Sequence, residues 1–184
     1  MKLDKLSKIS RAIAATAVGA VLFGTSLAPV QADEFTVGHS GADVAFSQYG
    51  LTGNGISVAV IDSGVYFCRD ASSNRFSADI SFVPNDSFQG DKCGHGTHVA
   101  GIVAGSGVGS TGSQFTRTFY GVARQARIAN IRVLDSNGQG TVSSVIAGIQ
   151  WAIANKTACN IRVMNLSLGH PVGESSRPTR SARR

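Results

Sequence analysis

Four short apolar stretches along the chain have the length and composition of β-strands. The clearest spans residues 56–61, is almost wholly apolar and ends at Asp62, Ser63 and Gly64, which is the pattern of a parallel strand buried on both faces. The other three span residues 78–83, 126–134 and 161–166. A largely parallel sheet is therefore the first expectation.

Helical periodicity lies between these strands. Val99, Ile102 and Val103 recur at helical spacing, so a helix with one inward-facing side is predicted to begin near His95. A second helix is predicted after Thr141, which can cap it. Its predicted core-facing positions are Val142, Val145, Ile146, Ile149 and Ile153. The strand, helix and strand between 126 and 166 form a parallel crossover unit, which indicates the α/β class. A short helix over residues 42–49 is also expected.

Two ionisable side chains stand where α/β folds place their chemistry. Asp62 follows the first strand, at the rim where open α/β sheets build their sites. His95 opens the next helix between two glycines. Taken alone, Asp62 is also a good turn or cap residue. His95 taken alone is either part of a helix start or, with His98 three residues on, one ligand of a metal.

Two sequence motifs then narrow these alternatives. Residues 94–101, Gly-His-Gly-Thr-His-Val-Ala-Gly, resemble the histidine motif of the subtilisin-like serine proteases, the subtilases. Residues 58–65, Val-Ala-Val-Ile-Asp-Ser-Gly-Val, resemble the aspartate motif of that family, and the two motifs occur in the family's order. The resemblance implies a doubly wound, mostly parallel α/β sheet. It also implies that His95 is the general base and that Asp62 accepts the second imidazole N–H, whereas no catalytic role passes to His98.

The resemblance also implies where a protein or peptide substrate binds. Ser167, Leu168 and Gly169 match the segment that lines the primary specificity pocket and pairs its backbone with the substrate. Gly138 and Gly140 lie in a loop that would flank the other edge of the peptide. As sequence alone, both segments are also compatible with ordinary connecting loops.

Calcium is common in this family, and the loop after the histidine helix is where many members bind it. Residues 106–118 are rich in Gly, Ser and Thr, with no dense set of carboxylate or Asn side chains. We therefore expect neither calcium nor another metal or cofactor.

The serine of the family's triad has no counterpart after Gly169. No Gly-Thr-Ser-Met-Ala type motif follows there, and no asparagine that could help bind an oxyanion. Ser26 sits in a similar string, but it precedes Asp62 and falls within an expected signal peptide. We expect residues 33–174 to be the N-terminal part of a peptidase domain, C-terminally truncated and inactive alone, with a complementary C-terminal fragment as a partner. The alternative is a non-catalytic exported module that holds an extended peptide.

The two ends of the chain carry most of its excess positive charge. Residues 1–32 have a basic start, an apolar segment and a small-residue end, which predicts a signal peptide cleaved after Ala32 and a secreted or otherwise exported protein; an uncleaved membrane anchor is the alternative. Residues 175–184 are Arg-rich without apolar periodicity and are expected to be disordered. The formal charge is +6, yet without residues 1–32 and 177–184 nine basic side chains face ten acidic ones. Nucleic acid, and the membrane after cleavage, are therefore not expected partners.

Three cysteines remain in a chain whose exported setting permits disulfides. Cys68 and Cys93 both fall between the aspartate and histidine motifs, so a bridge between them is expected. Cys159 is then either a buried free thiol or is paired with something that this chain does not contain.

Overall fold

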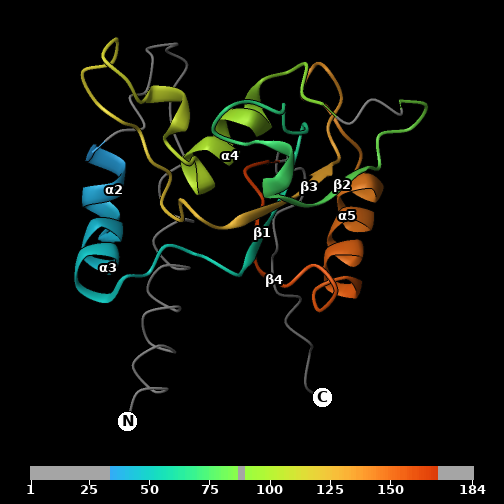
Figure 1. Cartoon of the computed structure of the whole chain (residues 1–184). Coiled ribbons are helices and arrows are strands. Elements are labelled where there is room, and N and C mark those ends of the chain that lie inside the picture. The colour runs from blue at the N-terminus through green and yellow to red at the C-terminus, as the bar shows by residue number, and fades with distance from the viewer. Residues whose placement is uncertain (1–33, 87–89, 170–184) are drawn as a thin grey trace, which may run out of the picture.

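The computed structural model describes residues 34–86 and 90–169 (Figure 1). The predicted signal peptide and the Arg-rich tail therefore lie outside the described residues. Two short helices, α2 (Glu34–Ser40) and α3 (Ala42–Tyr49), precede the sheet. The prediction of α3 is confirmed, whereas the mixed polar composition around α2 gives no indication of a helix.

One parallel sheet organises the rest of the chain, with strand order β2-β3-β1-β4. Its strands are β1 (Ser57–Asp62), β2 (Phe76–Ser81), β3 (Arg127–Arg132) and β4 (Ile161–Asn165). Each lies at a predicted stretch, with its ends shifted by at most two residues. The register of β1 and β3 places Asp62 opposite Arg132, so both strands end at the same edge of the sheet.

Two longer helices cover opposite faces of this sheet: α4 (His95–Ala104) and α5 (Val142–Ala154) (Figure 1). The α4 side buries Val58, Val60, Val99, Ala100 and Ile128, and the α5 side buries Ala59, Ile61, Ala129, Ile131 and Val133. Every residue of β1 is buried, as an apolar parallel strand requires. Two single-turn helices, η1 (Ser73–Arg75) and η2 (Val108–Ser110), lie in the connections. Within residues 34–86 and 90–169, no helix has both the length and the apolar character needed to cross a membrane.

Helix α5 begins as predicted but presents a different face to the sheet. The Thr141 side chain accepts a hydrogen bond from the backbone N–H of Ser144 at 3.1 Å, which confirms the predicted cap. The buried positions of the helix are Ser144, Gly148 and Ala152, and Val145 and Ile149 are half-buried. The prediction that Val142, Ile146 and Ile153 face the core is wrong, because these three side chains are exposed.

Close approach of α5 to the sheet explains this difference. A Cβ built on Gly148 would lie 2.8 Å from Val133 Cγ1 and 3.0 Å from Ile131 Cγ2, which is too close for a side chain. The helix therefore lies on the sheet through its small residues. Its larger apolar side chains are left on the flank and on the outer side.

Two buried polar side chains interrupt the apolar pattern of β3. Asn130 donates to Asp79 Oδ1 at 2.8 Å, and Arg132 lies 2.8 Å from Asp86 Oδ2. Burial raises the pKa of Asp79, and the hydrogen bond from Asn130 opposes that shift in part. These partners lie far away in the sequence, so the polar layer follows from the sheet order and not from local pattern.

Candidate active site

Asp62 is the last residue of β1, and its side chain is fully buried. Because β1 lies between β3 and β4, the carboxylate stands at the carboxyl-end rim of the sheet with a strand on each side. Its Oδ1 accepts a hydrogen bond from the backbone N–H of Ser63 at 2.7 Å. Its Oδ2 is buried and has no hydrogen-bond partner among the described residues.

His95 is the first residue of α4, and its ring meets the same carboxylate. The imidazole Nδ1 lies 2.7 Å from Asp62 Oδ1. Against an ionised carboxylate, which only accepts hydrogen bonds, a neutral imidazole donates from Nδ1 and keeps a lone pair on Nε2. The His95 side chain is 43% exposed and that of Asp62 is 0% exposed. A ring held on its buried side and open on the other has the arrangement of a general base.

Asp91 organises the first turn of the same helix, and the sequence analysis does not identify it. Its Oδ1 accepts from Ser63 Oγ at 2.9 Å and from the Gly94 N–H at 2.8 Å. Its Oδ2 accepts from the backbone N–H of Thr97 at 2.8 Å and from Thr97 Oγ1 at 2.7 Å. Burial raises the pKa of Asp91, but the hydrogen bonds from Thr97, Gly94 and Ser63 outweigh it and hold that pKa below its ordinary value of 3.8. A clue lies in the sequence: an Asp shortly before a helix whose N-cap residue, Gly94, has no side chain.

The predicted substrate segments lie on either side of β1. Gly138 and Gly140 follow β3, and the segment from Ser167 to Gly169 follows β4, so both leave the rim that carries Asp62. Gly138 has φ +73°, a conformation that favours glycine, and the Asp135 carboxylate closes this loop by accepting from two of its backbone N–H groups.

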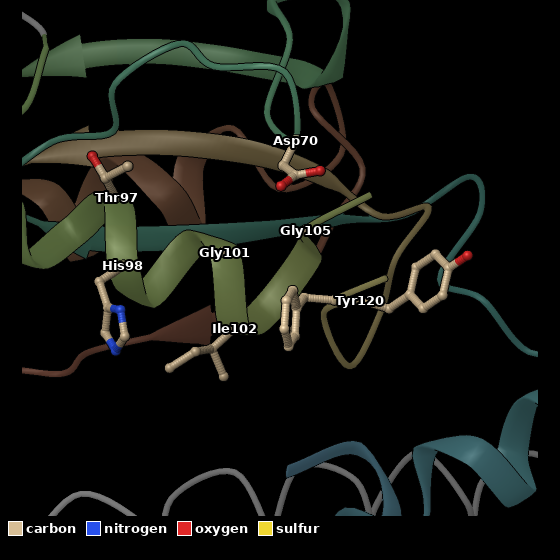
Figure 2. Close-up of a pocket in the computed structure, with 8 residues that line it drawn as sticks. Asp70, Thr97, His98, Gly101, Ile102, Gly105 and Tyr120 are labelled. Atoms are coloured by element: carbon tan, nitrogen blue, oxygen red, sulfur yellow. The ribbon is translucent and has the colours of Figure 1, made fainter. Parts of the chain in front are cut away.

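His98 does not lie on the side of α4 that packs against the sheet. Figure 2 shows His98 and Ile102 projecting from one side of the helix and Thr97 from the opposite side. His98 and Ile102 help to line a pocket with Asp70, Gly101, Gly105, Phe119 and Tyr120. Ile102 is half-buried, whereas Val99 belongs to the buried cluster on the α4 side of the sheet and Val103 packs against that cluster. No group of three or more His, Cys, Asp or Glu side chains that could hold a metal occurs in the described part of the chain.

The three cysteines are free thiols in this structure, so the expected bridge between Cys68 and Cys93 is not formed in it. Both thiols are exposed. The backbone of Cys68 is held in a turn by two hydrogen bonds with Ala71. A Cβ built on Gly138 would lie 3.3 Å from Cys93 Sγ, which places that sulfur against the loop after β3. The two thiols thus belong to different local structures.

Most of the chain is similar in sequence to a known protein family. The model of the subtilase family matches residues 53–183. Subtilisin E of Bacillus subtilis (strain 168) is 41% identical over 137 residues, which cover 73% of this chain and 32% of that protein. A thermostable alkaline protease of Halalkalibacterium halodurans is 39% identical over 127 residues, covering 69% and 31%.

Among solved structures, a cold adapted subtilisin-like serine proteinase is 38% identical, with a TM-score of 0.47, over 57% of this chain and 34% of that one. The chain spans about a third of the length of the curated relatives it matches. Since the family model matches well over half of the chain, and relatives about 40% identical carry the same segment, the chain belongs to the subtilase family of serine peptidases.

Proposed function

We propose that this chain is the N-terminal part of a secreted serine endopeptidase domain, spanning residues 33–174, in which Asp62 and His95 supply the acid–base half of a Ser-His-Asp triad. The observation that carries the proposal is the 2.7 Å contact between His95 Nδ1 and the buried Asp62 Oδ1. Secretion rests on the signal peptide predicted for residues 1–32.

The proposed reaction is acyl transfer to a serine followed by hydrolysis. Nε2 of His95 takes the proton from the attacking serine hydroxyl and later gives it to the leaving amine. Asp62 holds the ring in the required tautomer and stabilises the imidazolium that forms between these steps. In the hydrolysis half Nε2 takes a proton from the water that attacks the acyl-enzyme and returns it to the serine oxygen, so His95 and Asp62 end each cycle in their starting state.

We further propose that the substrate is an extended peptide held between two segments of the rim. The segment of Ser167, Leu168 and Gly169 would pair with one edge of the peptide, and Gly138 and Gly140 would flank the other. The sheet order supports this, because β3 and β4 are the two neighbours of β1. A peptide between them would cross the exposed side of His95.

We propose that residues 1–184 by themselves do not hydrolyse peptides and that hydrolysis needs a segment that carries a serine nucleophile. Residues 170–184 contain no motif of the kind that carries the family's nucleophile. Loss of the nucleophile costs a subtilase about a millionfold in turnover. The purified chain should not be labelled by a fluorophosphonate. Stoichiometric labelling that is lost in His95→Ala would overturn this part of the proposal.

The proposal as a whole is tested in a chimera that places residues 53–169 of this chain in the matching segment of Subtilisin E. The chimera should hydrolyse a peptide substrate, and His95→Ala should lower kcat by about a millionfold. The matched control is His98→Ala, which removes the other histidine of the helix and should change kcat less than about tenfold. An active chimera that is indifferent to His95→Ala would refute the assigned role. A folded chimera that binds the peptide but does not cleave it would favour a peptide-binding module.

A further inference from the structure

We propose that Asp91 is the positioning residue that holds His95 on Asp62, acting through Ser63 and the first turn of α4. This inference deepens the proposed function and rests on it. Asp91 lies four residues before His95 and contacts neither the imidazole nor Asp62 in any hydrogen bond of the structure. Its effect on the site is therefore transmitted through the backbone that carries the two catalytic residues.

The connection from Asp91 to Asp62 runs through Ser63. Ser63 Oγ donates to Asp91 Oδ1 and accepts from the Gly96 N–H at 2.9 Å. The Ser63 N–H donates to Asp62 Oδ1, the same oxygen that meets His95. Ser63 thus ties the end of β1 both to Asp91 and to the residue that follows His95.

The connection from Asp91 to α4 runs through Thr97. Its N–H and its hydroxyl both donate to Asp91 Oδ2, and the hydroxyl also accepts from the Tyr66 N–H at 2.9 Å. Two backbone points after β1, Ser63 and Tyr66, are therefore fixed to the first turn of the helix. The distance between the catalytic aspartate and histidine is set by this frame.

A carboxylate is the group that this position requires. All four groups around Asp91 donate hydrogen bonds, and an ionised carboxylate is the only side-chain group that accepts at both of its oxygens. An amide would turn its NH₂ group toward two of these donors. Gly94, the N-cap residue of α4, has no side chain that could cap the helix. The Thr97 N–H therefore donates to Asp91 instead. The negative charge also suits the positive end of the helix dipole.

The first test is spectroscopic and uses the full 184-residue chain, with histidine ring nitrogens labelled for NMR. We expect solvent exchange of the His95 Nδ1 proton to be about tenfold faster in Asp91→Asn, because a charge-assisted bond that holds the helix start is lost. Thr97→Val, which keeps the shape and removes the hydroxyl, should act in the same direction. Thr97→Ser, which restores the hydroxyl, should return the exchange rate to that of the unaltered chain.

The matched control is Asp70→Asn. Asp70 also accepts a backbone N–H, that of Gly109 at 2.8 Å, but it braces the loop beyond the other end of α4. Asp70→Asn should leave solvent exchange of the His95 Nδ1 proton unchanged. Equal exchange rates in Asp91→Asn, Thr97→Val and the unaltered chain would overturn the proposal. An equal acceleration in Asp70→Asn would also overturn it, because the effect would then be general loosening. If Asp91→Asn does not fold, the comparison of Thr97→Val with Thr97→Ser decides alone.

The second test is kinetic and uses the chimera with Subtilisin E. Asp91→Asn should lower kcat about 10–100-fold with KM nearly unchanged, since a small displacement of the base affects the chemical step and not substrate binding. A change in KM alone would contradict a positioning role. If the chimera itself is inactive, the proposed function fails, whereas the NMR comparison still reports on Asp91. The two failures are therefore distinguishable.

Discussion

Gly96, the second residue of α4, packs directly against the carbonyl oxygen of Gly64, and no side chain fits between them. A Cβ built on Gly96 would also lie 3.2 Å from Cβ and Oδ1 of Asp62. A glycine is thus needed directly after His95 because the start of the helix lies on the end of β1. This close approach is what allows a side chain on α4 to reach a side chain on the strand.

We predict that Gly96→Ala destabilises the folded chain by about 1–3 kcal/mol, because the methyl group meets backbone that cannot move away. Gly101→Ala is the matched control on the same helix. Nothing lies within 4 Å of a Cβ built on Gly101, so alanine should stabilise the helix by about 0.5–1 kcal/mol. Denaturant titrations of the two variants should move in opposite directions. A neutral Gly96→Ala would show that the helix start is not in contact with Gly64 in solution.

The stability of the site should depend on the ionisation of Asp91. Its pKa is lowered in the folded chain, so its contribution to stability is present above the ordinary value of 3.8 and is lost as pH falls through the lower folded value. The free energy of unfolding that Asp91→Asn loses relative to the unaltered chain should therefore be greatest at neutral pH and shrink below about pH 4.

Asp79→Asn is the control, because the stability change that it causes should depend on pH in the opposite direction. Burial raises the pKa of Asp79, so ionisation of that group opposes folding, and stability is lost as pH rises from the ordinary value of 3.8 through the raised one. As pH rises through this range, Asp79→Asn should become more stable relative to the unaltered chain. Urea titrations across the acid range measure both effects. If the free energy of unfolding varied with pH in the same way in the unaltered chain, Asp91→Asn and Asp79→Asn, the pKa shifts of Asp91 and Asp79 would be contradicted.

Sequence pattern predicts the parts of this fold that depend on local chemistry. The apolar run before Asp62 predicts β1, and Thr141 predicts the start of α5. The Asp62 and His95 motifs lie 33 residues apart, and the structure brings them together because a strand end and a helix start meet at one rim.

The parts that sequence analysis predicts wrongly or misses depend on contacts between distant segments. Periodicity selects the large apolar residues of α5 as its core face, yet the sheet approaches so closely that Gly148 occupies the contact. The acceptor role of Asp91 requires Ser63, which lies 28 residues earlier in the chain. Arg132 is fully buried at the end of β3, where Asp86 lies beside it in the fold.

We predict that the 184-residue chain self-associates through β4. Among the described strands β4 pairs only with β1, so no described strand covers its other edge, and the side chains of Val163, Met164 and Leu166 are exposed. Val163→Lys should reduce association, because a charge on an edge strand opposes pairing with a second copy. Val108→Lys, which places the same charge in an exposed turn away from the sheet edge, is the control. Sedimentation velocity over a concentration series measures the effect, and a monomer at every concentration would disprove it.

The central claim is that the buried Asp62 orients His95 as a general base. The measurement that tests it most directly is the kcat of Asp62→Asn in the chimera with Subtilisin E, compared with Asp79→Asn, which alters a half-buried carboxylate on the sheet. The account predicts that Asp62→Asn lowers kcat by about 10⁴-fold at nearly constant KM, the loss typical of replacing the orienting aspartate of such a triad, while Asp79→Asn stays within about tenfold of the unaltered chimera. A folded Asp62→Asn chimera with undiminished kcat would contradict it.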